Sequence, residues 1–193
     1  MSLILISSCY SSKFKTSSID NSDPISNELK NKIQVIKLKK SIGIIFPAEY
    51  KMNFNQNLFV NRFTPTEKEV RDAENEIEKK YLKSEKKIIY DQVYVKTNEI
   101  YGNQKINKQK EYSKLIKSAV KEAKKSPKFY RQYAGYIENG EKKLIINFID
   151  FSKDPYNLKS KLKTKFIIGF GEWFETNTRI KIYNYKSKKL TVL

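Results

Sequence analysis

The sequence predicts an α+β fold in which a helix packs on a curved antiparallel sheet of four to five strands, after an N-terminal extension. Apolar residues recur at helical spacing over 65–83 and again over 107–125. From residue 128 onward the period changes to two, which is typical of strands. The chain has 193 residues, of which 39% are hydrophobic, so it holds enough apolar material for one core of ordinary size.

The chain is predicted to form a single domain over residues 32–193. Residues 10–31 are rich in serine, asparagine and aspartate, a composition typical of a flexible linker. Two short apolar stretches follow the linker, at 33–39 and 42–46, and both suit strands. Pro47 ends the second one.

The first helix is predicted to run from residue 65 to about 83. Thr64 is expected to cap it, with Pro65 at the first helical position and Glu67 three residues after the cap. Apolar residues on one face form its buried stripe: Val70, Ala73, Ile77 and Tyr81. We interpret the carboxylates of this helix as a solvated face.

The second helix is predicted over 107–125 and ends before Pro127. Its apolar stripe comprises Tyr112, Leu115, Ile116, Ala119, Val120 and Ala123. Because the sheet needs a cover for its apolar face, we expect this helix to lie on the sheet. Residues 88–95 are compatible with a strand or with an extension of a helix, and the sequence does not decide between them.

The C-terminal half is predicted to be a series of strands. Asn139-Gly140 lies between two β-rich runs and is typical of a tight hairpin turn. The strands are expected at 129–137, 142–151, 165–170, 178–185 and 189–193. This order of elements is similar to cystatin-like or NTF2-like architectures, as an analogy of order only.

The N-terminus carries a short motif of a different kind. Ile6-Ser7-Ser8-Cys9 resembles the lipobox of bacterial lipoproteins, in which an aliphatic residue and two small residues precede a cysteine that is lipidated. A secretory signal has a basic start and a longer apolar stretch, whereas here the stretch is Leu3 to Ile6 and no lysine or arginine precedes it. We interpret residues 1–9 as a truncated lipoprotein signal. The resemblance implies a bacterial envelope protein anchored to a membrane through Cys9.

Two further stretches, 63–74 and 129–137, resemble uncharacterised exported bacterial lipoproteins. In that group a strand of the form Tyr-Arg-Gln-Tyr-x-Gly-Tyr, here residues 130–136, precedes a hairpin. The resemblance spans 63–193 and implies a location and a fold, but no chemistry.

The chain is strongly basic, with a formal net charge of +18. Only four of its 39 basic residues are arginines, and arginine is the side chain that grips bases and phosphates in a bidentate manner. We therefore favour a solvated lysine-rich surface over a nucleic-acid partner or another anionic polymer. On an extended segment, alternate lysines would form one row that could meet anions or protect a strand edge, and we favour the second role. That row comprises Lys159, Lys161, Lys163 and Lys165.

Composition limits the available chemistry. The chain has no histidine and one cysteine, so histidine-based catalysis, histidine metal ligands and cysteine-cluster zinc sites are excluded, and we expect no metal site. Gly169-Phe170-Gly171 lacks the remaining glycine and the following helix of a dinucleotide fingerprint, so we expect no cofactor and interpret these glycines as a sheet bend. Carboxylates near strand ends leave a hydrolase as a third alternative: Asp150, Glu172 and Glu175.

If a binding surface exists, we expect it on an open face of the sheet. Its candidate residues are Arg131, Tyr133, Trp173 and Arg179. The sequence thus predicts a monomeric, non-catalytic, membrane-tethered envelope lipoprotein with a binding or structural role. An intracellular nucleic-acid-binding protein is the main alternative.

Overall fold

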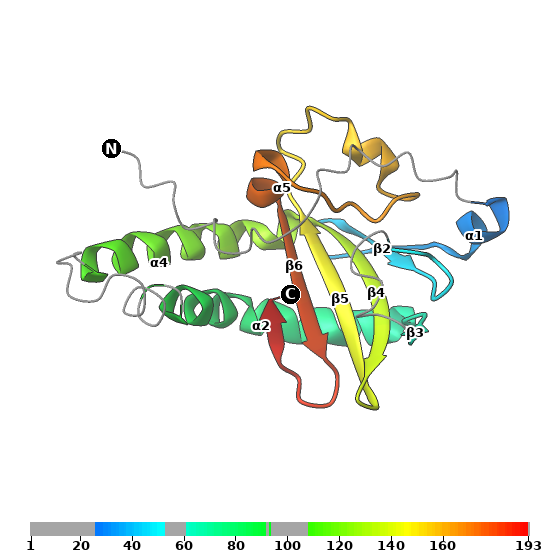
Figure 1. Cartoon of the computed structure of the whole chain (residues 1–193), viewed down its shortest axis with the longest axis horizontal. Coiled ribbons are helices and arrows are strands. Elements are labelled where there is room, and N and C mark those ends of the chain that lie inside the picture. The colour runs from blue at the N-terminus through cyan, green and yellow to red at the C-terminus, as the bar shows by residue number, and fades with distance from the viewer. Residues whose placement is uncertain (1–25, 53–60, 92, 94–107, 193) are drawn as a thin grey trace.

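The computed structural model describes residues 26–52, 61–91, 93 and 108–192. The lipobox-like motif and Cys9 lie outside these residues. Figure 1 shows a twisted sheet with helix α2 along one face and an irregular segment, drawn in orange, over the other. Helix α4 runs beside α2.

The sheet has seven strands, and all neighbouring strands are antiparallel except β2 and β4, which are parallel. The order is β1 (Gln34–Lys37), β2 (Ile42–Phe46), β4 (Tyr130–Glu138), β5 (Glu141–Ile149), β6 (Thr178–Asn184) and β7 (Leu190–Val192), and β3 (Arg62–Phe63) pairs with β4. The predicted α+β class, with a helix on a curved sheet, is confirmed. The sheet is larger than predicted because the N-terminal strands join it beside β4.

The hairpin between β4 and β5 follows the predicted turn. Asn139 and Gly140 both have positive φ angles, 52° and 74°, as a tight two-residue turn requires. The resulting register pairs Arg131 with Phe148 and Gln132 with Asn147. These cross-strand pairs lie on opposite faces of the sheet, and each face is used differently.

Helix α2 (Glu67–Tyr90) begins two residues later than predicted. Its cap is Thr66, which forms a capping box with Glu69, whereas the hydroxyl of Thr64 accepts a hydrogen bond from the backbone N–H of Ala48 at 2.9 Å. The helix also continues through Ile88 to Tyr90, so the beginning of the ambiguous stretch 88–95 is helical. Residues 94–95 lie outside the described residues.

Helix α2, rather than α4 (Lys108–Lys125), covers the sheet. The predicted stripe of α2 is buried and joins one core cluster with residues of β2, β4 and β5, among them Ile45, Tyr133 and Ile146. The prediction that the second helix is the cover was wrong. The apolar stripe of α4 packs against α2 instead of the sheet. Among the described apolar side chains of α4, only Ala119 is buried.

The opposite face is covered by residues 150–177, which we call the irregular cover. It contains the short helices η4 (Leu158–Lys161) and α5 (Glu172–Asn177). Its apolar side chains form a second core cluster with the sheet, through Leu158, Leu162, Phe166, Ile167 and Trp173. The predicted strand at 165–170 was wrong, because this stretch lies over the sheet instead of pairing in it.

The glycines at 169 and 171 do not mark a sheet bend. A Cβ on Gly169 would lie 2.5 Å from the ring of Phe174, and Gly171 starts α5 with a φ of 100°. Both therefore fit the close packing and the turn at the beginning of α5.

Helix α1 (Asn27–Lys32) forms at the end of the stretch that we predicted as a linker. Leu29 and Ile33 pack against the same cluster as Leu158 and Leu162. The chain therefore enters the fold on the face of the irregular cover, and Figure 1 shows α1 beside that orange segment.

Candidate functional site

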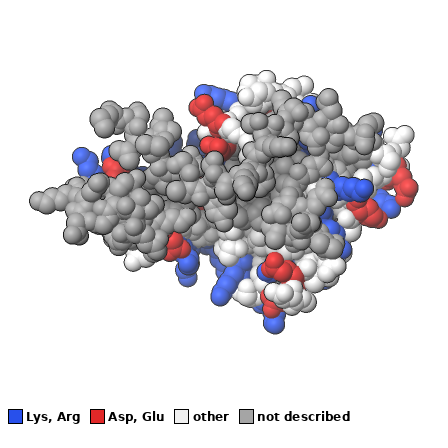
Figure 2. All heavy atoms as spheres, in the orientation of Figure 1, with Lys and Arg blue, Asp and Glu red and all other residues white. Residues whose placement is uncertain are grey.

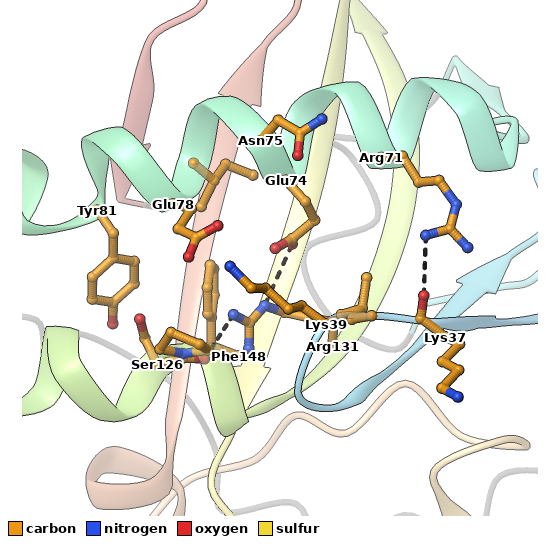
Figure 3. Close-up of a pocket in the computed structure, with 13 residues that line it drawn as sticks. Lys37, Lys39, Arg71, Glu74, Asn75, Glu78, Tyr81, Ser126, Arg131 and Phe148 are labelled. Atoms are coloured by element: carbon orange, nitrogen blue, oxygen red, sulfur yellow. Dashed lines mark hydrogen bonds and ion pairs between the residues drawn. The ribbon is translucent and has the colours of Figure 1, made fainter.

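A groove of about 730 Å³ lies between α2, the turn that joins β1 to β2, and the short helix η3 (Ser126–Lys128). Figure 3 shows its lining, with α2 on one side and Lys37 and Lys39 on the other. A smaller hollow of about 250 Å³ continues between α2 and α4. The two hollows share Glu78, Tyr81, Ser126 and Pro127, and we call them together the α2 groove.

Arg131 forms the floor of the groove and is only 3% exposed. Its two terminal nitrogens donate to the carbonyl oxygens of Phe129 (2.6 Å) and Ser126 (2.8 Å). Its Nε lies 3.4 Å from Oε1 of Glu74, and the guanidinium carbon lies 4.0 Å from the centroid of the Phe148 ring. The groups that surround Arg131 therefore use its charge and its donors within the fold.

Tyr133 completes this buried group. Its hydroxyl donates a hydrogen bond of 2.8 Å to Oε1 of Glu74, the oxygen that also faces Arg131. Burial raises the pKa of Tyr133 well above its ordinary value, and the charge of Glu74 raises it further. The hydroxyl is therefore a fixed hydrogen-bond donor at neutral pH.

A second polar group lies further along α2. The hydroxyl of Tyr81 donates to Glu122 of α4 at 2.9 Å, and Nε of Arg179 lies 3.4 Å from the same carboxylate oxygen. Lys181, which is 1% exposed, forms an ion pair with Glu85. Burial raises the pKa of Tyr81, and the charge of Glu122 adds to this effect.

The prediction that the carboxylates of the helix over 65–83 form a solvated face was therefore wrong for Glu74, and Glu85, beyond the predicted end of that helix, is buried in the same way. The side chain of Glu74 is 18% exposed and that of Glu85 is 14% exposed, and each compensates a buried cation of the sheet. Such pairs are costly to break, because the remaining charge stays buried without a partner.

The rim of the groove differs from its floor. Lys37, Lys39, Asn75 and Glu78 are exposed there. Arg71 is already held, because it donates to Glu67 and to the carbonyl oxygen of Lys37. Apolar side chains, Leu38, Ile77 and Phe148 among them, lie below the rim. The arrangement suits a ligand with an apolar body and an anionic group that Lys39 can meet, whereas the ammonium of Lys37 points away from α2 (Figure 3).

The four residues of the predicted binding face do not form one surface. Arg131, Tyr133 and Arg179 face α2 and α4, whereas Trp173 lies in the cluster on the opposite face. Its indole nitrogen donates to the carbonyl oxygen of Lys153 at 2.7 Å. Strand β4 is covered on both faces, so the open face that we expected around these residues is absent from the described part of the chain.

The predicted lysine row is not extended. Lys159 and Lys161 belong to η4, and Lys163 and Lys165 follow it in a turn and a bend. All four belong to the irregular cover, so they neither alternate along a strand nor protect a strand edge.

The predicted carboxylates serve local structure or lie on the surface. Asp150 accepts a hydrogen bond from the backbone N–H of Ser152 at 2.9 Å. Glu172 and Glu175 lie exposed in the first turn of α5. No group of three or more carboxylate or cysteine side chains that could hold a metal ion occurs among the described residues.

Sequence reasoning missed Glu74 and the groove beside it. Glu74 follows Val70 by four residues and precedes Ile77 by three, so it lies on the buried stripe of α2. A carboxylate at that spacing indicates a buried cation opposite, and Arg131, the one basic residue of β4, is its counterpart. The groove itself depends on how the turn after β1 meets α2, which no local pattern encodes.

Comparisons of the chain with protein-family models, curated proteins and solved structures find no match. None of the helices in the described ranges is long and apolar enough to cross a membrane. On the face seen in Figure 2, described basic side chains are interspersed with acidic ones instead of forming one continuous field.

Proposed function

We propose that the protein is a monomeric, non-catalytic binding protein that a lipid on Cys9 tethers to a bacterial envelope membrane. Its ligand would occupy the α2 groove. The lipobox-like stretch Ile6–Cys9 supports the tether, and the serine-rich sequence after it supports a connection to the folded domain.

The observation that carries the proposal is the placement of the groove relative to the point where the chain enters the fold. Helix α1 packs on the irregular cover, whereas the groove lies on the α2 face of the sheet. A chain tethered from its N-terminus would therefore present the groove away from the membrane, where a soluble ligand or a cell-wall component can reach it.

The chemistry of the groove supports binding through its rim. On the floor, Tyr133 donates to Glu74 and the terminal nitrogens of Arg131 donate to backbone carbonyls, whereas Nε of Arg131 faces Glu74 in an ion pair without a hydrogen bond. Lys39 forms no ion pair within the described residues, so its charge remains for a ligand. An amphiphile with one anionic group satisfies both features.

Cell fractionation tests the tether. The gene is expressed with its upstream region, beside a Cys9→Ala version, and both proteins are followed into membrane and soluble fractions. We expect the native protein in membranes and the variant in the soluble fraction. Recovery of both proteins from the soluble fraction would overturn the tether.

A fluorescent probe tests the groove. Anilinonaphthalene sulfonate has an apolar body and one anionic group, which is the proposed ligand chemistry, and its emission rises in apolar surroundings. We expect Lys39→Glu to weaken its binding about tenfold through charge reversal at the rim, since 1.4 kcal/mol corresponds to one decade. Lys40→Glu, outside the groove lining, is the matched control. Equal effects of both variants would argue against the groove.

The alternative is a nucleic-acid-binding protein, and the net charge of +18 favours it. All four arginines, however, already contact groups of the fold: Arg62 with Gly135 and Tyr50, Arg71 with Glu67 at the surface, Arg131 with Glu74, and Arg179 with Glu122. A labelled single-stranded oligonucleotide tests this alternative. It predicts binding that falls steeply as salt rises.

A further inference from the structure

We propose that the irregular cover docks on the surface of an anionic lipid bilayer. The contact would use the lysine surface, which we define as Lys153, Lys159, Lys161 and Lys163 together with Tyr156. This inference rests on the proposed tether and adds the orientation in which the tethered domain lies on its membrane.

The fold leaves the positive charges of the lysine surface without counterions. The four lysines of this surface are exposed, and none of them forms an ion pair with the described residues. On α2, Lys68, Lys79 and Lys80 each pair with a carboxylate three or four residues away, whereas Lys83 and Lys86 form no ion pair with the described residues.

The one carboxylate within residues 151–165 is Asp154, and the local backbone uses it. Its two oxygens accept hydrogen bonds of 2.8 Å from the backbone N–H groups of Leu158 and Lys159. The remaining carboxylates of the cover lie at Asp150, before this stretch, and in α5 after it. Cations without local partners attract the anionic headgroups of a bilayer.

The lysine surface also carries aromatic side chains. Tyr156 is 53% exposed, and its ring centroid lies 6.3 Å from that of Trp173. The aromatic row continues through Phe151 to Tyr130, and the ammonium of Lys159 lies 5.0 Å from the centroid of Tyr130. Tyrosine and tryptophan favour the boundary between headgroups and acyl chains, because each has an apolar body and a polar tip.

The N-terminal part of the chain enters the fold on the face that carries the lysine surface. Helix α1 packs through Leu29 on the cluster that contains Leu158 and Leu162. These two leucines lie next to lysines of the lysine surface in the sequence. Sixteen residues, 10–25, separate Cys9 from Ser26, and a chain of that length reaches at most about 55 Å. A lipid on Cys9 would therefore keep the domain within that distance of the bilayer, and charge attraction to the lysine surface would orient it.

A bilayer fits this surface better than a nucleic acid does. The cations are lysines on short helices and turns, and the arginines that would read or grip a nucleic acid are used elsewhere in the fold. The lysine surface also does not line either hollow of the α2 groove, so it offers no channel for a strand.

Vesicle binding of the full chain with Cys9→Ala tests the inference without the anchor. Vesicles of phosphatidylcholine alone are compared with vesicles that also contain phosphatidylglycerol, at about 0.1 M and about 1 M salt, between which the screening length falls from about 10 Å to about 3 Å. We expect binding to the anionic vesicles only, and only at the lower salt concentration.

Two quadruple variants give the matched comparison. One replaces Lys153, Lys159, Lys161 and Lys163 by glutamine; the other replaces four exposed lysines of α2 and α4 by glutamine, Lys83, Lys86, Lys117 and Lys121. Both lose four charges, and thermal unfolding verifies that both fold. We expect vesicle binding to fall at least tenfold for the first and less than twofold for the second.

Three results would overturn the inference: equal losses for the two variants, no binding to anionic vesicles, or stronger binding of a single-stranded oligonucleotide through the same four lysines. These failures are distinct from failure of the tether. Membrane fractionation that depends on Cys9 together with no vesicle binding would leave the tether and remove the docking surface. Vesicle binding together with fractionation that ignores Cys9 would remove the tether.

Discussion

The two faces of the sheet are covered by elements of different kinds, and the sheet meets them with different polar groups. Toward α2 it presents buried cations, Arg131 and Lys181, which pair with Glu74 and Glu85 of the helix. Toward the irregular cover it presents neutral amides, Gln132 and Asn147, which bind backbone atoms.

The difference follows from the covers themselves. A helix satisfies its own backbone, so only its side chains can bond to the sheet. An irregular segment leaves N–H and C=O groups without partners, and these must be satisfied when they are buried. Gln132 accepts from the N–H of Ile167 at 2.7 Å and donates to the carbonyl oxygens of Leu162 and Lys165. The amides therefore satisfy backbone groups of the irregular cover, whereas the backbone groups of α2 are satisfied by the hydrogen bonds within the helix.

The largest effect is expected from Gln132→Leu. The change replaces the amide with an apolar side chain of similar size, and the carbonyl oxygen of Leu162 and the N–H of Ile167, both buried, lose the hydrogen bonds that Gln132 makes to them. We expect a loss of about 4 kcal/mol in the free energy of unfolding, since each orphaned group costs about 1–3 kcal/mol. Chemical denaturation measures it.

Gln34→Leu, at an exposed position of β1, is the control and should cost less than about 0.5 kcal/mol. A small effect of Gln132→Leu would mean that the cover does not depend on the amides. The contrast between the two faces would then lose its basis.

A smaller effect, about 3 kcal/mol, is expected from Arg131→Met, because Glu74 is left largely buried without its cation. The hydrogen bond from Tyr133 to Glu74 remains and keeps the loss below that of Gln132→Leu. Replacing both partners, as Arg131→Met with Glu74→Leu, should recover part of the loss in a double-mutant cycle. Additive losses would contradict a coupled pair on the α2 face.

The smallest effect is expected from Tyr133→Phe, and it depends on pH. The pKa of Tyr133 is raised in the folded protein, so its contribution is fully present below the unfolded pKa of about 10 and is lost as the pH rises above it. We expect the variant to be less stable by about 1.5 kcal/mol at pH 7. Unfolding at successive pH values should show this difference shrinking above pH 10.

Tyr156→Phe is the matched control, because Tyr156 is exposed and the variant has the same number of tyrosines. Its stability difference from the native protein should stay near zero across the same pH range. A constant difference for Tyr133→Phe would contradict the raised pKa of Tyr133 in the folded protein.

Local patterns predicted much of the fold. The stripe from Val70 to Tyr81 and the turn at Asn139-Gly140 are encoded by short-range spacing, and both are present in the structure. The irregular cover was not predictable, since its β-prone stretch 165–170 lies on the sheet only because distant residues, Gln132 and Tyr50, bond to its backbone. The groove depends on the same kind of long-range contact. Glu74 alone carried a local signal, through its place on the buried stripe.

Site-specific fluorescence quenching measures the orientation of the domain on its membrane. Cys9 is the sole cysteine and is acylated in our proposal, so a thiol dye reacts only at an introduced cysteine. Ser160→Cys places the dye on the irregular cover, and Asn75→Cys places it at the rim of the α2 groove. The anchored protein is placed in anionic vesicles that contain a lipid-borne quencher. If the irregular cover faces the bilayer, we expect strong quenching at residue 160 and little at residue 75. Equal quenching, or stronger quenching at residue 75, would contradict this orientation.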